Sequence, residues 1–255
     1  SRYDQFDLRT SAQAQGDGFV LNGVKTVVLH GAQADALIVS ARSSGAQRDT
    51  QGIALFVVPA DAPGVTRTDY RTIDCQRAAD ITLHDVRVPA SALLGKPENG
   101  WDLLDAVADY GAALLCAEAI GALDAINAAT LEYVKARQQF GVPIGKFQAL
   151  QHRMAEMFMQ LELARSMAML AAAKLDCADA QEHRRTISAA KVRVGQALKF
   201  IGQQAIQLHG GMGVTNELPA AHYFKRLTMI ELTLGDTDHH LARFIAQPGF
   251  RAVTA

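Results

Sequence analysis

The chain has 255 residues, of which 49% are hydrophobic, and this is enough to bury a substantial core in one large domain or two smaller ones. Its 25 basic and 26 acidic residues leave a net charge of -1 with no long block of like charge. This balance argues against nucleic acid as a partner.

Cysteine usage and hydropathy indicate in which cellular compartment the protein is expected. Cys75, Cys116 and Cys177 are far apart and odd in number, which fits neither a disulfide framework nor a zinc site and favours a reducing environment. No uninterrupted apolar run reaches the length of a membrane span, and the segment SRYDQFDLRT has no signal-peptide layout. We therefore expect a cytoplasmic location and no membrane partner.

The first hundred residues carry the signals of β-structure. In GFVLNGVKTVVL, Asn22 and Gly23 stand between two apolar runs, which is the strongest short-range signal for a hairpin turn. Residues 36–41 and 53–58 predict two buried strands. Residues 79–89 predict a last strand that a proline ends.

After Gly100 the apolar period becomes that of an α-helix. A first long helix is predicted over about residues 101–136. Two more are predicted by apolar residues spaced alternately by four and three: Leu150, Met154, Met157, Leu161, Ala164, Ala168 and Ala171 in one, and Val194, Leu198, Ile201, Ala205 and Leu208 in the other. A shorter helix begins near Pro219, and a last one near Thr237 with Asp236 at its N-cap. These elements predict an α+β protein.

Three linkers, one segment of the predicted β-domain and the LGDTDHHLARF segment resemble the acyl-CoA dehydrogenase family. They are DGFVLNGVKTVVLHGAQADALIVSAR (17–42), VRVPASALLGKPENGW (86–101), RQQFGVPIGKFQALQHRMAEM (137–157), QLHGGMGVTNELPAAHYFKR (207–226) and LGDTDHHLARF (234–244). The first is similar to the middle β-domain of those flavoproteins, and the last to the pimeloyl-CoA dehydrogenase small-subunit type. The family's N-terminal helical domain has no counterpart in the chain, so the resemblance implies a piece of a longer protein.

The domain organisation follows from the elements and the resemblance together. We expect a partial middle β-domain over residues 1–97, followed by a C-terminal antiparallel four-helix-type bundle over residues 98–255.

The resemblance implies FAD-dependent α,β-dehydrogenation of an acyl-CoA thioester, a step of fatty acid metabolism. In this reaction a carboxylate takes the α-proton while the β-hydrogen leaves as hydride to the flavin. The implied partners are electron-transfer flavoprotein and further subunits, in a homo-tetramer or in a hetero-oligomer with a paralogous chain. An alternative stays open, in which the chain is a non-catalytic subunit that contacts FAD while a paired chain holds the base.

For FAD, the resemblance implies contacts from two segments that in relatives reach the flavin of a neighbouring subunit. The residues are Arg137, Gln139 and Phe140 in one segment, and Gln207, Gly210 and Gly211 in the other. A guanidinium pairs with phosphate, and a glycine pair lets backbone amides approach it. A solvated helix end and a helix C-cap are the alternative interpretations. Asp238 and His240 stand at further flavin positions of the family, although neither residue type matches.

Asp236 is the candidate catalytic base. Counting back from DTDHHLARF places it opposite the family's glutamate, whereas counting forward from the glycine pair places Leu234 there, and counting from Arg226 places Gly235 there. The alternative role for Asp236 is the N-cap of the last helix, a position that aspartate favours. The family's second location for the base, on the first long helix, matches Gly111.

Three other places in the sequence bear on how well the chain matches the functional positions of the family. Asp109 matches a position that approaches CoA in some relatives and is the candidate substrate-binding residue, although Ala112 replaces the expected arginine. Glu118 stands in an apolar stretch, where a buried lone acid more often ties helices together than performs catalysis. Residues 27–29 are Val, Val and Leu where the family has Trp-x-Thr, so the threonine contact to the flavin ring is absent.

Overall fold

The structure is a computed structural model that describes residues 3–97 and 99–248. The chain divides into two compact units, residues 1–107 and residues 108–255, and each has its own apolar core. The predicted domain boundary between residues 97 and 98 stays a prediction. Residue 98 and both chain ends lie outside the described residues.

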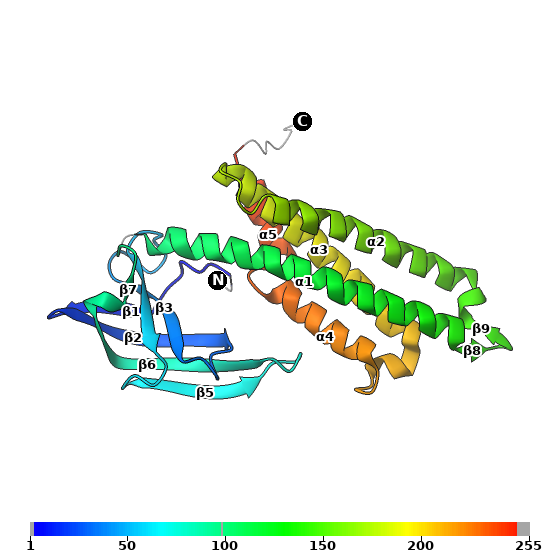
Figure 1. Cartoon of the computed structure of the whole chain (residues 1–255), viewed down its shortest axis with the longest axis horizontal. Helices are drawn as coiled ribbons and strands as arrows, with labels where there is room; N and C mark the ends of the chain where they lie inside the picture. The colour runs from blue at the N-terminus through cyan, green and yellow to red at the C-terminus, as the bar shows by residue number, and fades with distance from the viewer. Residues whose placement is uncertain (1–2, 98, 249–255) are drawn as a thin grey trace. The chain divides into compact units, whose positions relative to one another are not determined.

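The first unit is built on a seven-stranded mixed sheet (Figure 1). In the order β5-β6-β2-β1-β3-β4-β7, β1 pairs with β3 in parallel, and the other neighbours are antiparallel. The strands are β1 (Ser11–Gln15), β2 (Gly18–Leu29), β3 (Ala36–Arg42), β4 (Ile53–Pro59), β5 (Val65–Arg71), β6 (Arg77–Pro89) and β7 (Leu93–Leu94). Leu21, Phe56 and Ile81 belong to the core that the sheet covers. The partial β-domain is therefore confirmed.

The hairpin predicted at Asn22 and Gly23 is wrong. β2 continues through both residues, and the β1–β2 turn lies earlier, at Gly16 and Asp17, where Gly16 has a left-handed φ of 62°. Asn22 is bonded instead to Asp85 beside β2: its Nδ2 donates to Asp85 Oδ1 at 3.0 Å, and its Oδ1 accepts from the Asp85 amide at 2.8 Å. The register between β2 and β6 shifts next to Gly23. Here the asparagine–glycine pair marks a bulge inside a strand rather than a turn.

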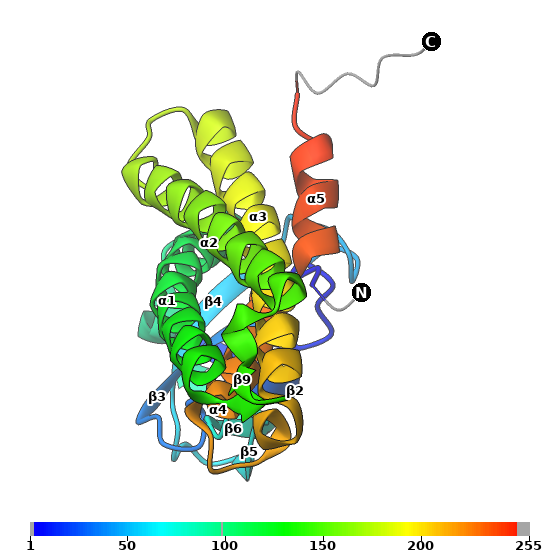
Figure 2. The ribbon, with the colours of Figure 1, turned by 90° about the vertical axis from the view of Figure 1, so that its right-hand side faces the viewer.

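The second unit is a helical bundle (Figures 1 and 2). Its long helices are α1 (Gly100–Ala136), which begins in the first unit, α2 (Gln148–Ala173) and α3 (Ala180–His209). Two shorter helices follow, α4 (Pro219–Leu232) and α5 (Thr237–Ile245). α3 packs against α2, α4 and α5, and Figure 2 shows it between α2 and α5. The bundle that follows the β-domain is as predicted.

The predicted apolar faces of α2 and α3 are confirmed. All five residues expected to face the core from α3 are buried. On α2 the buried residues are Met157, Leu161, Ala164, Ala168 and Ala171, while Leu150 and Met154 are partly buried against the same core. The spacing of four and three residues therefore identified the side of each helix that packs inward.

Short irregular elements connect the helices. A hairpin of β8 (Gln138–Gln139) and β9 (Val142–Pro143), followed by the 3-10 turn η2 (Ile144–Lys146), joins α1 to α2. A second 3-10 turn, η3 (Gly210–Val214), follows α3, and a third, η1 (Ala90–Ala92), precedes β7. Two of these connections, the hairpin and η3, contain four of the residues expected to contact FAD: Gln139, Phe140, Gly210 and Gly211.

Helix α1 has no uninterrupted apolar run of membrane-spanning length, yet it is hydrophobic as a whole. By length and composition it is apolar enough to cross a membrane, since its most hydrophobic stretch of 18 residues has a mean hydropathy of 1.5 and 33% of that stretch is buried. The core helix of a bundle meets the same criterion. α1 contributes Cys116, Leu123 and Ile126 to the core of the second unit, and this packing accounts for part of its hydropathy.

Candidate functional site

The predicted flavin residues of the first segment lie on or beside the β8–β9 hairpin. Arg137, Gln139 and Phe140 are all exposed, and Phe140 keeps 90% of its surface accessible. Phe140 and Gly141 have φ values of 54° and 75°, the pair of positive angles that a two-residue type I′ turn requires. A bulky side chain with positive φ is uncommon and strained. An aromatic ring held outward in this way is typical of a contact surface.

The second segment lies at the C-terminal end of α3. Gly210 is the C-cap of that helix with a φ of 60°, so the C-cap interpretation is confirmed for this residue. A Cβ added at Gly210 or Gly211 would meet no heavy atom within 4 Å. At Gly213, by contrast, it would lie 2.5 Å from the carbonyl oxygen of Ile206. Neither packing nor a positive φ explains glycine at 211, and the exposed backbone there is open to a ligand.

Tyr133 brings the two segments together. Its hydroxyl donates to the carbonyl oxygen of His209 at 3.3 Å, and its ring stacks on the His209 imidazole with centroids 4.4 Å apart. Tyr133 stands in the last turn of α1 before Arg137, and His209 directly precedes Gly210. The hairpin and the glycine pair therefore lie at one end of the bundle, which we call the hairpin–glycine end.

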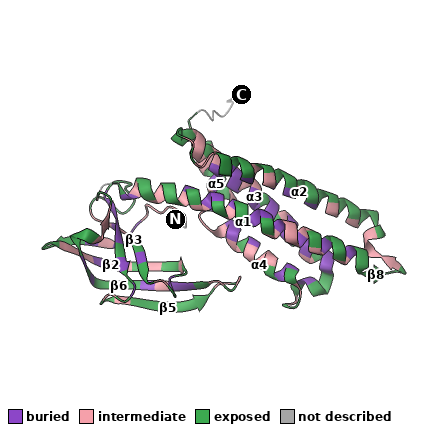
Figure 3. Ribbon diagram, viewed as in Figure 1, coloured by how far each residue is buried: buried purple, intermediate pink, exposed green. Residues whose placement is uncertain are grey.

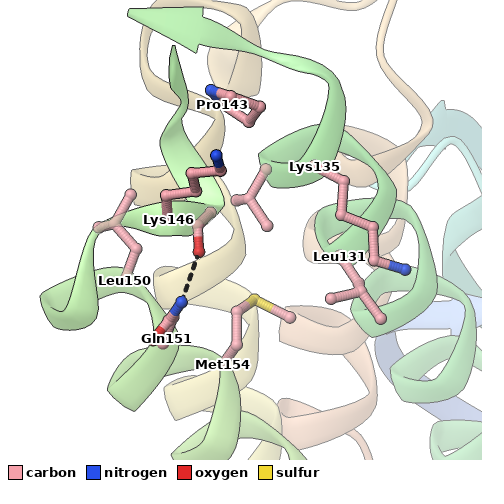
Figure 4. A pocket seen from close by; sticks show the side chains of 9 residues that line it. Leu131, Lys135, Pro143, Lys146, Leu150, Gln151 and Met154 are labelled. Atoms are coloured by element: carbon pink, nitrogen blue, oxygen red, sulfur yellow. Dashed lines mark hydrogen bonds between the residues drawn. The ribbon is translucent and has the colours of Figure 1, made fainter. Parts of the chain in front are cut away.

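A pocket of about 440 Å³ opens beside the hairpin (Figure 4). Its lining residues are Leu131, Val134, Lys135, Pro143, Gly145, Lys146, Leu150, Gln151 and Met154. The amide of Gln151 donates to the carbonyl oxygen of Gly145 at 2.9 Å. No predicted site residue lines this pocket. Sequence reasoning missed it because its apolar residues follow the same helical period as the core.

The other part of the predicted site is the turn between α4 and α5. Leu234 and Gly235 have left-handed φ values of 56° and 106°. Asp236 is the N-cap of α5, and its Oδ1 accepts from the amide of His239 at 2.9 Å. The N-cap interpretation of Asp236 is therefore confirmed. Its role as catalytic base stays a prediction.

Lys191 holds this turn from α3. The side chain is buried, and Nζ donates to the carbonyl oxygens of Ile230, Glu231 and Gly235 at 2.9, 3.1 and 2.9 Å. Burial lowers the pKa of Lys191 to about 8. Its neighbour Cys116 lies in the core, and burial raises the pKa of that thiol to about 11. An amine in contact with three carbonyls ties the end of α4 to the turn.

Two more buried side chains fix the turn from its other side. His240 Nε2 lies 2.9 Å from the carbonyl oxygen of Leu234, so this nitrogen carries the proton and donates. Burial lowers the pKa of His240 to about 3, which keeps the ring neutral. The Glu231 carboxylate accepts from the amide and hydroxyl of Thr237 at 3.0 and 2.9 Å, and from Lys199 at 3.0 Å. His240 thus serves the turn, and its predicted contact with flavin stays a prediction, as does that of exposed Asp238 on α5.

The turn meets α1 at the family's second location for the base. A Cβ added at Gly111 would lie 2.6 Å from Leu234 Cδ1, so the leucine side chain lies against the glycine. The structure therefore brings together two positions that the sequence matched separately to a catalytic carboxylate. Neither position carries one.

Two acids of α1 that the sequence singled out, Asp109 and Glu118, are both ion-paired. Asp109 is buried, and its two carboxylate oxygens accept from the guanidinium of Arg243, while His183 Nε2 lies 3.8 Å from Oδ2. Substrate binding by Asp109 stays a prediction. Glu118 accepts from Arg226 Nε and Nη2 at 2.6 and 2.8 Å, which confirms that it ties α1 to α4. It is exposed rather than buried, because the pair lies at the bundle surface.

In the first unit a groove of about 770 Å³ is lined in part by Val27 and Val28, where the family has Trp-x-Thr. Lys25 also lines it, and its Nζ donates to Ser40 Oγ at 3.0 Å. Burial lowers the pKa of Lys25 to about 8. The segment thus presents valine side chains to the groove, and Leu29 stands at the position of the family's threonine.

Two protein-family models match the chain. The one described as "Acyl-CoA dehydrogenase, C-terminal domain" matches residues 98–247, and the one described as "Acyl-CoA dehydrogenase, middle domain" matches residues 1–86. The mitochondrial short-chain specific acyl-CoA dehydrogenase of Rattus norvegicus is 32% identical over 232 residues, which cover 90% of this chain and 56% of the rat protein. The chain therefore spans little more than half the length of this relative.

Solved structures of similar fold include two with informative names. The FAD complex of PigA superposes with a TM-score of 0.90 at 26% identity, over 99% of this chain and 66% of that chain. The ChsE4-ChsE5 complex from Mycobacterium tuberculosis superposes with a TM-score of 0.81 at 27% identity, over 92% of this chain and 61% of that chain.

Proposed function

The chain belongs to the acyl-CoA dehydrogenase family, and we propose that it is the flavin-contacting subunit of a FAD-dependent acyl-CoA dehydrogenase whose catalytic base is carried by a paired chain. The observation that supports this proposal is the contact between Leu234 and Gly111. α,β-Dehydrogenation needs a proton acceptor over the α-carbon of the thioester. A leucine and a glycine meet where the family places that acceptor, so in this proposal the paired chain provides it.

The hairpin–glycine end fits the anionic and aromatic parts of FAD. Arg137 presents an exposed guanidinium, which pairs with phosphate oxygens in a bidentate manner. Gly211 adds no side chain that would shield its backbone, and the Phe140 ring, which meets Phe147 edge-on at 6.1 Å, is 90% exposed and can stack on a ligand. Gln139 and Gln207 add side-chain amides at the same end. When bound, FAD supplies the acceptor for the hydride that leaves the β-carbon. The chain's own contribution is to bind and orient the cofactor.

Pairing with another chain is supported by the separation of the two parts of the predicted site. Lys191, which contacts the α4–α5 turn, and His209, at the hairpin–glycine end, are separated on α3 by roughly 27 Å of helix. A flavin bound at one end of this chain and completed by the turn of another would use both parts. One similar structure is described as a complex of two differently named chains, ChsE4 and ChsE5.

Catalysis by this chain alone, with Asp236 as base, is the second candidate function. The observation in its favour is that Asp236 lies two residues from Leu234 in the same turn and is half-buried. Against it stands the hydrogen bond from the His239 amide, which already engages the carboxylate as a helix cap. Aspartate is also one methylene shorter than glutamate, and a misplacement of about 1 Å can lower a rate roughly a hundredfold.

The proposal extends to partners and location. The substrate is an acyl-CoA thioester, the electron acceptor is electron-transfer flavoprotein, and the assembly is a tetramer or a hetero-oligomer acting in fatty acid metabolism. The chain ending supports the pimeloyl-CoA dehydrogenase small-subunit type as the subgroup. Cys75, Cys116 and Cys177 are free, which supports a reducing compartment such as the cytoplasm.

The test uses full-length protein loaded with FAD and a panel of acyl-CoA thioesters of increasing chain length. We expect dithionite to bleach the flavin of the protein purified without a paired chain, and no thioester to do so. Co-purification of a second, related chain that restores bleaching supports the proposal. Rapid bleaching of the lone chain by any thioester would overturn it in favour of the second candidate.

A further inference from the structure

Lys25 is a nucleophilic side chain that the proposed function does not use. It lies on β2, a strand with one buried residue among partly buried and exposed ones (Figure 3). The side chain lines the groove of about 770 Å³ in the first unit, and its Nζ donates to Ser40 Oγ on β3 at 3.0 Å. The serine hydroxyl carries no charge, so this bond does not hold the amine in its protonated form as an ion pair would.

Three lysines of the chain differ in accessibility and in basicity. Lys199 is exposed, and the hydrogen bond of its ion pair with Glu231 raises its pKa. Burial lowers the pKa of Lys191 to about 8, but that side chain is enclosed by the bundle and its Nζ contacts three carbonyl oxygens. Burial also lowers the pKa of Lys25 to about 8, although this lysine stands at the wall of a groove. Because a lysine is nucleophilic only as the free amine, Lys25 combines reactivity with access.

Apolar side chains line the groove together with Lys25. Val24 and Val27 belong to β2, and Ile38 belongs to β3. The three residues are 55%, 53% and 70% exposed, so the groove keeps an accessible apolar wall. A wall of this kind can receive the acyl chain of a thioester, because apolar surface is removed from water on both sides.

The charged side chains of the groove favour an anionic ligand. Besides Lys25, those among the described lining residues are Asp4, Asp7 and Arg9. Both acids pair with Arg48, at 2.8 and 3.5 Å, so their charge is compensated. Arg9 is exposed, and a guanidinium binds phosphate oxygens such as those of coenzyme A in a bidentate manner. The groove thus offers an apolar wall for an acyl chain, a cation for phosphates and an amine for a carbonyl group.

We propose that Lys25 is a site of covalent acylation by acyl-CoA thioesters. The free amine attacks the carbonyl carbon of the thioester, and a carbon–nitrogen bond forms as the carbon–sulfur bond breaks. The nitrogen loses a proton, and coenzyme A leaves as its thiol, so the reaction needs no oxidant or further reactant. The acylated nitrogen keeps one N–H, which can still donate to Ser40 Oγ. Acylation also removes the cost of burying a cation, because an amide is uncharged.

Incubation of the full-length protein with acetyl-CoA or butyryl-CoA at about pH 7.5 tests this site. At that pH about a quarter of an amine with a pKa of about 8 is free base, against about a thousandth for an ordinary lysine. A less basic amine is a weaker nucleophile, as is also found among thiols, so we expect a net gain of roughly tenfold. Mass spectrometry of peptides cleaved at glutamate gives the acylation rate of each lysine. Lys25 should react at least about tenfold faster than Lys199, and Lys191 should stay unmodified in the folded protein.

Denaturation and a groove variant are the controls. In concentrated urea the three lysines should react at similar rates, because their differences come from the fold. Butyryl-CoA should raise the ratio of the Lys25 rate to the Lys199 rate above the value for acetyl-CoA, and Ile38→Ser should reduce that increase. An equal ratio for the two thioesters contradicts the role of the apolar wall.

The proposal is overturned if folded Lys25 reacts no faster than Lys199, or if its preference persists in urea. Both measurements record an amide on a lysine and do not involve flavin. Their outcome is therefore independent of the proposed function.

Discussion

The Cδ1 atom of Leu234 lies 2.6 Å from the position that a Cβ would take on Gly111. The leucine thus fills the space that any side chain at residue 111 would need. The leucine at 234 therefore accounts for the glycine at 111, and the glycine makes room for the leucine. It follows that a carboxylate introduced at position 234 would project to the same place as one introduced on α1.

Leu234→Glu is expected to give the chain a proton acceptor at this place. Glutamate is close to leucine in size and also has one Cβ, so it meets the same backbone conformation without added strain. A positioned general base contributes roughly a hundredfold to ten-thousandfold in rate. In stopped-flow measurements, flavin reduction by an acyl-CoA should therefore appear in this variant. Leu234→Gln is the isosteric control, and equal rates for the two variants contradict the prediction.

Asp236→Asn and Asp236→Ala separate the cap from the base. Asparagine caps helices as well as aspartate does, so the first change should leave the melting temperature almost unaltered. Alanine removes the acceptor for the His239 amide and should lower the free energy of unfolding by about 1 kcal/mol. In the assembled enzyme neither change should slow flavin reduction. A loss of several orders of magnitude in Asp236→Asn would identify Asp236 as the base.

Arg137→Ala is expected to weaken FAD binding. The guanidinium is exposed at the hairpin–glycine end, and a charge-assisted bond to phosphate is worth roughly 1.5 to 3 kcal/mol, or about tenfold to a hundredfold in affinity. Flavin occupancy after dialysis measures the effect. The control is Lys135→Ala, which removes a nearby exposed cation that pairs with Glu132 at 2.9 Å. Equal occupancy in both variants would remove Arg137 from the site.

Gly211→Ala distinguishes a ligand-binding glycine from a structural one. A Cβ at residue 211 meets open space, and this residue does not have a positive φ, so folding stability should be maintained or slightly improved. FAD affinity should fall, because the Cβ stands in front of the backbone amides. Gly210→Ala should instead lower stability by about 1 kcal/mol, since residue 210 has a φ of 60°. Unchanged affinity in Gly211→Ala argues against the glycine pair as a phosphate site.

Lys191 makes the free energy of unfolding depend on pH, and its lowered pKa fixes the direction of that dependence. Burial lowers its pKa from 10.5 to about 8, so between these values the unfolded chain holds a proton that the native chain has released. The free energy of unfolding should therefore rise as the pH increases through this window. Below pH 8 the amine is charged in both states, and the full cost of burying that charge is present. From pH 7.5 to 9.5 the gain is on the order of 2 kcal/mol.

Urea unfolding of wild type and Lys191→Met at these two pH values isolates this contribution from that of Lys25. The variant should lose the pH-dependent gain. It should also be less stable, because three carbonyl oxygens lose their donor. Parallel pH profiles of wild type and variant would show that Lys191 keeps its ordinary pKa in the folded protein.

Helices were predictable from the sequence because their signal is local and repeated. The period along α3 identified the buried side, and Asp236 marked the start of α5 through its own chemistry. Strands depend on neighbours far away in the chain. Residues 36–41, 53–58 and 79–89 were recognised as strands, whereas β1 and β5 were not, since β5 is exposed along most of its length and lacks an alternating pattern.

The parts of the site that the sequence left open depend on long-range contacts. Counting residues from three different motifs gave three candidates for the base position. Insertions between a motif and the base change the count, and the sequence does not show where the insertions fall. The contact of Leu234 with Gly111 joins the α4–α5 turn to α1, and only the folded bundle reveals it. The same holds for Asn22, whose bond to Asp85 converts an apparent turn signal into a bulge.

The buried thiol of Cys116 can be used to measure slow opening motions of the bundle. With a pKa of about 11 and no exposed surface, this cysteine reacts with a thiol reagent only after α1 has separated locally from α3. Its labelling rate therefore measures how often the bundle opens under native conditions. Exposed Cys75, labelled at once in the first unit, calibrates the reagent within the same molecule. Cys116 lies five residues from Gly111 on α1, so its labelling rate reports how often this helix opens close to the contact with Leu234.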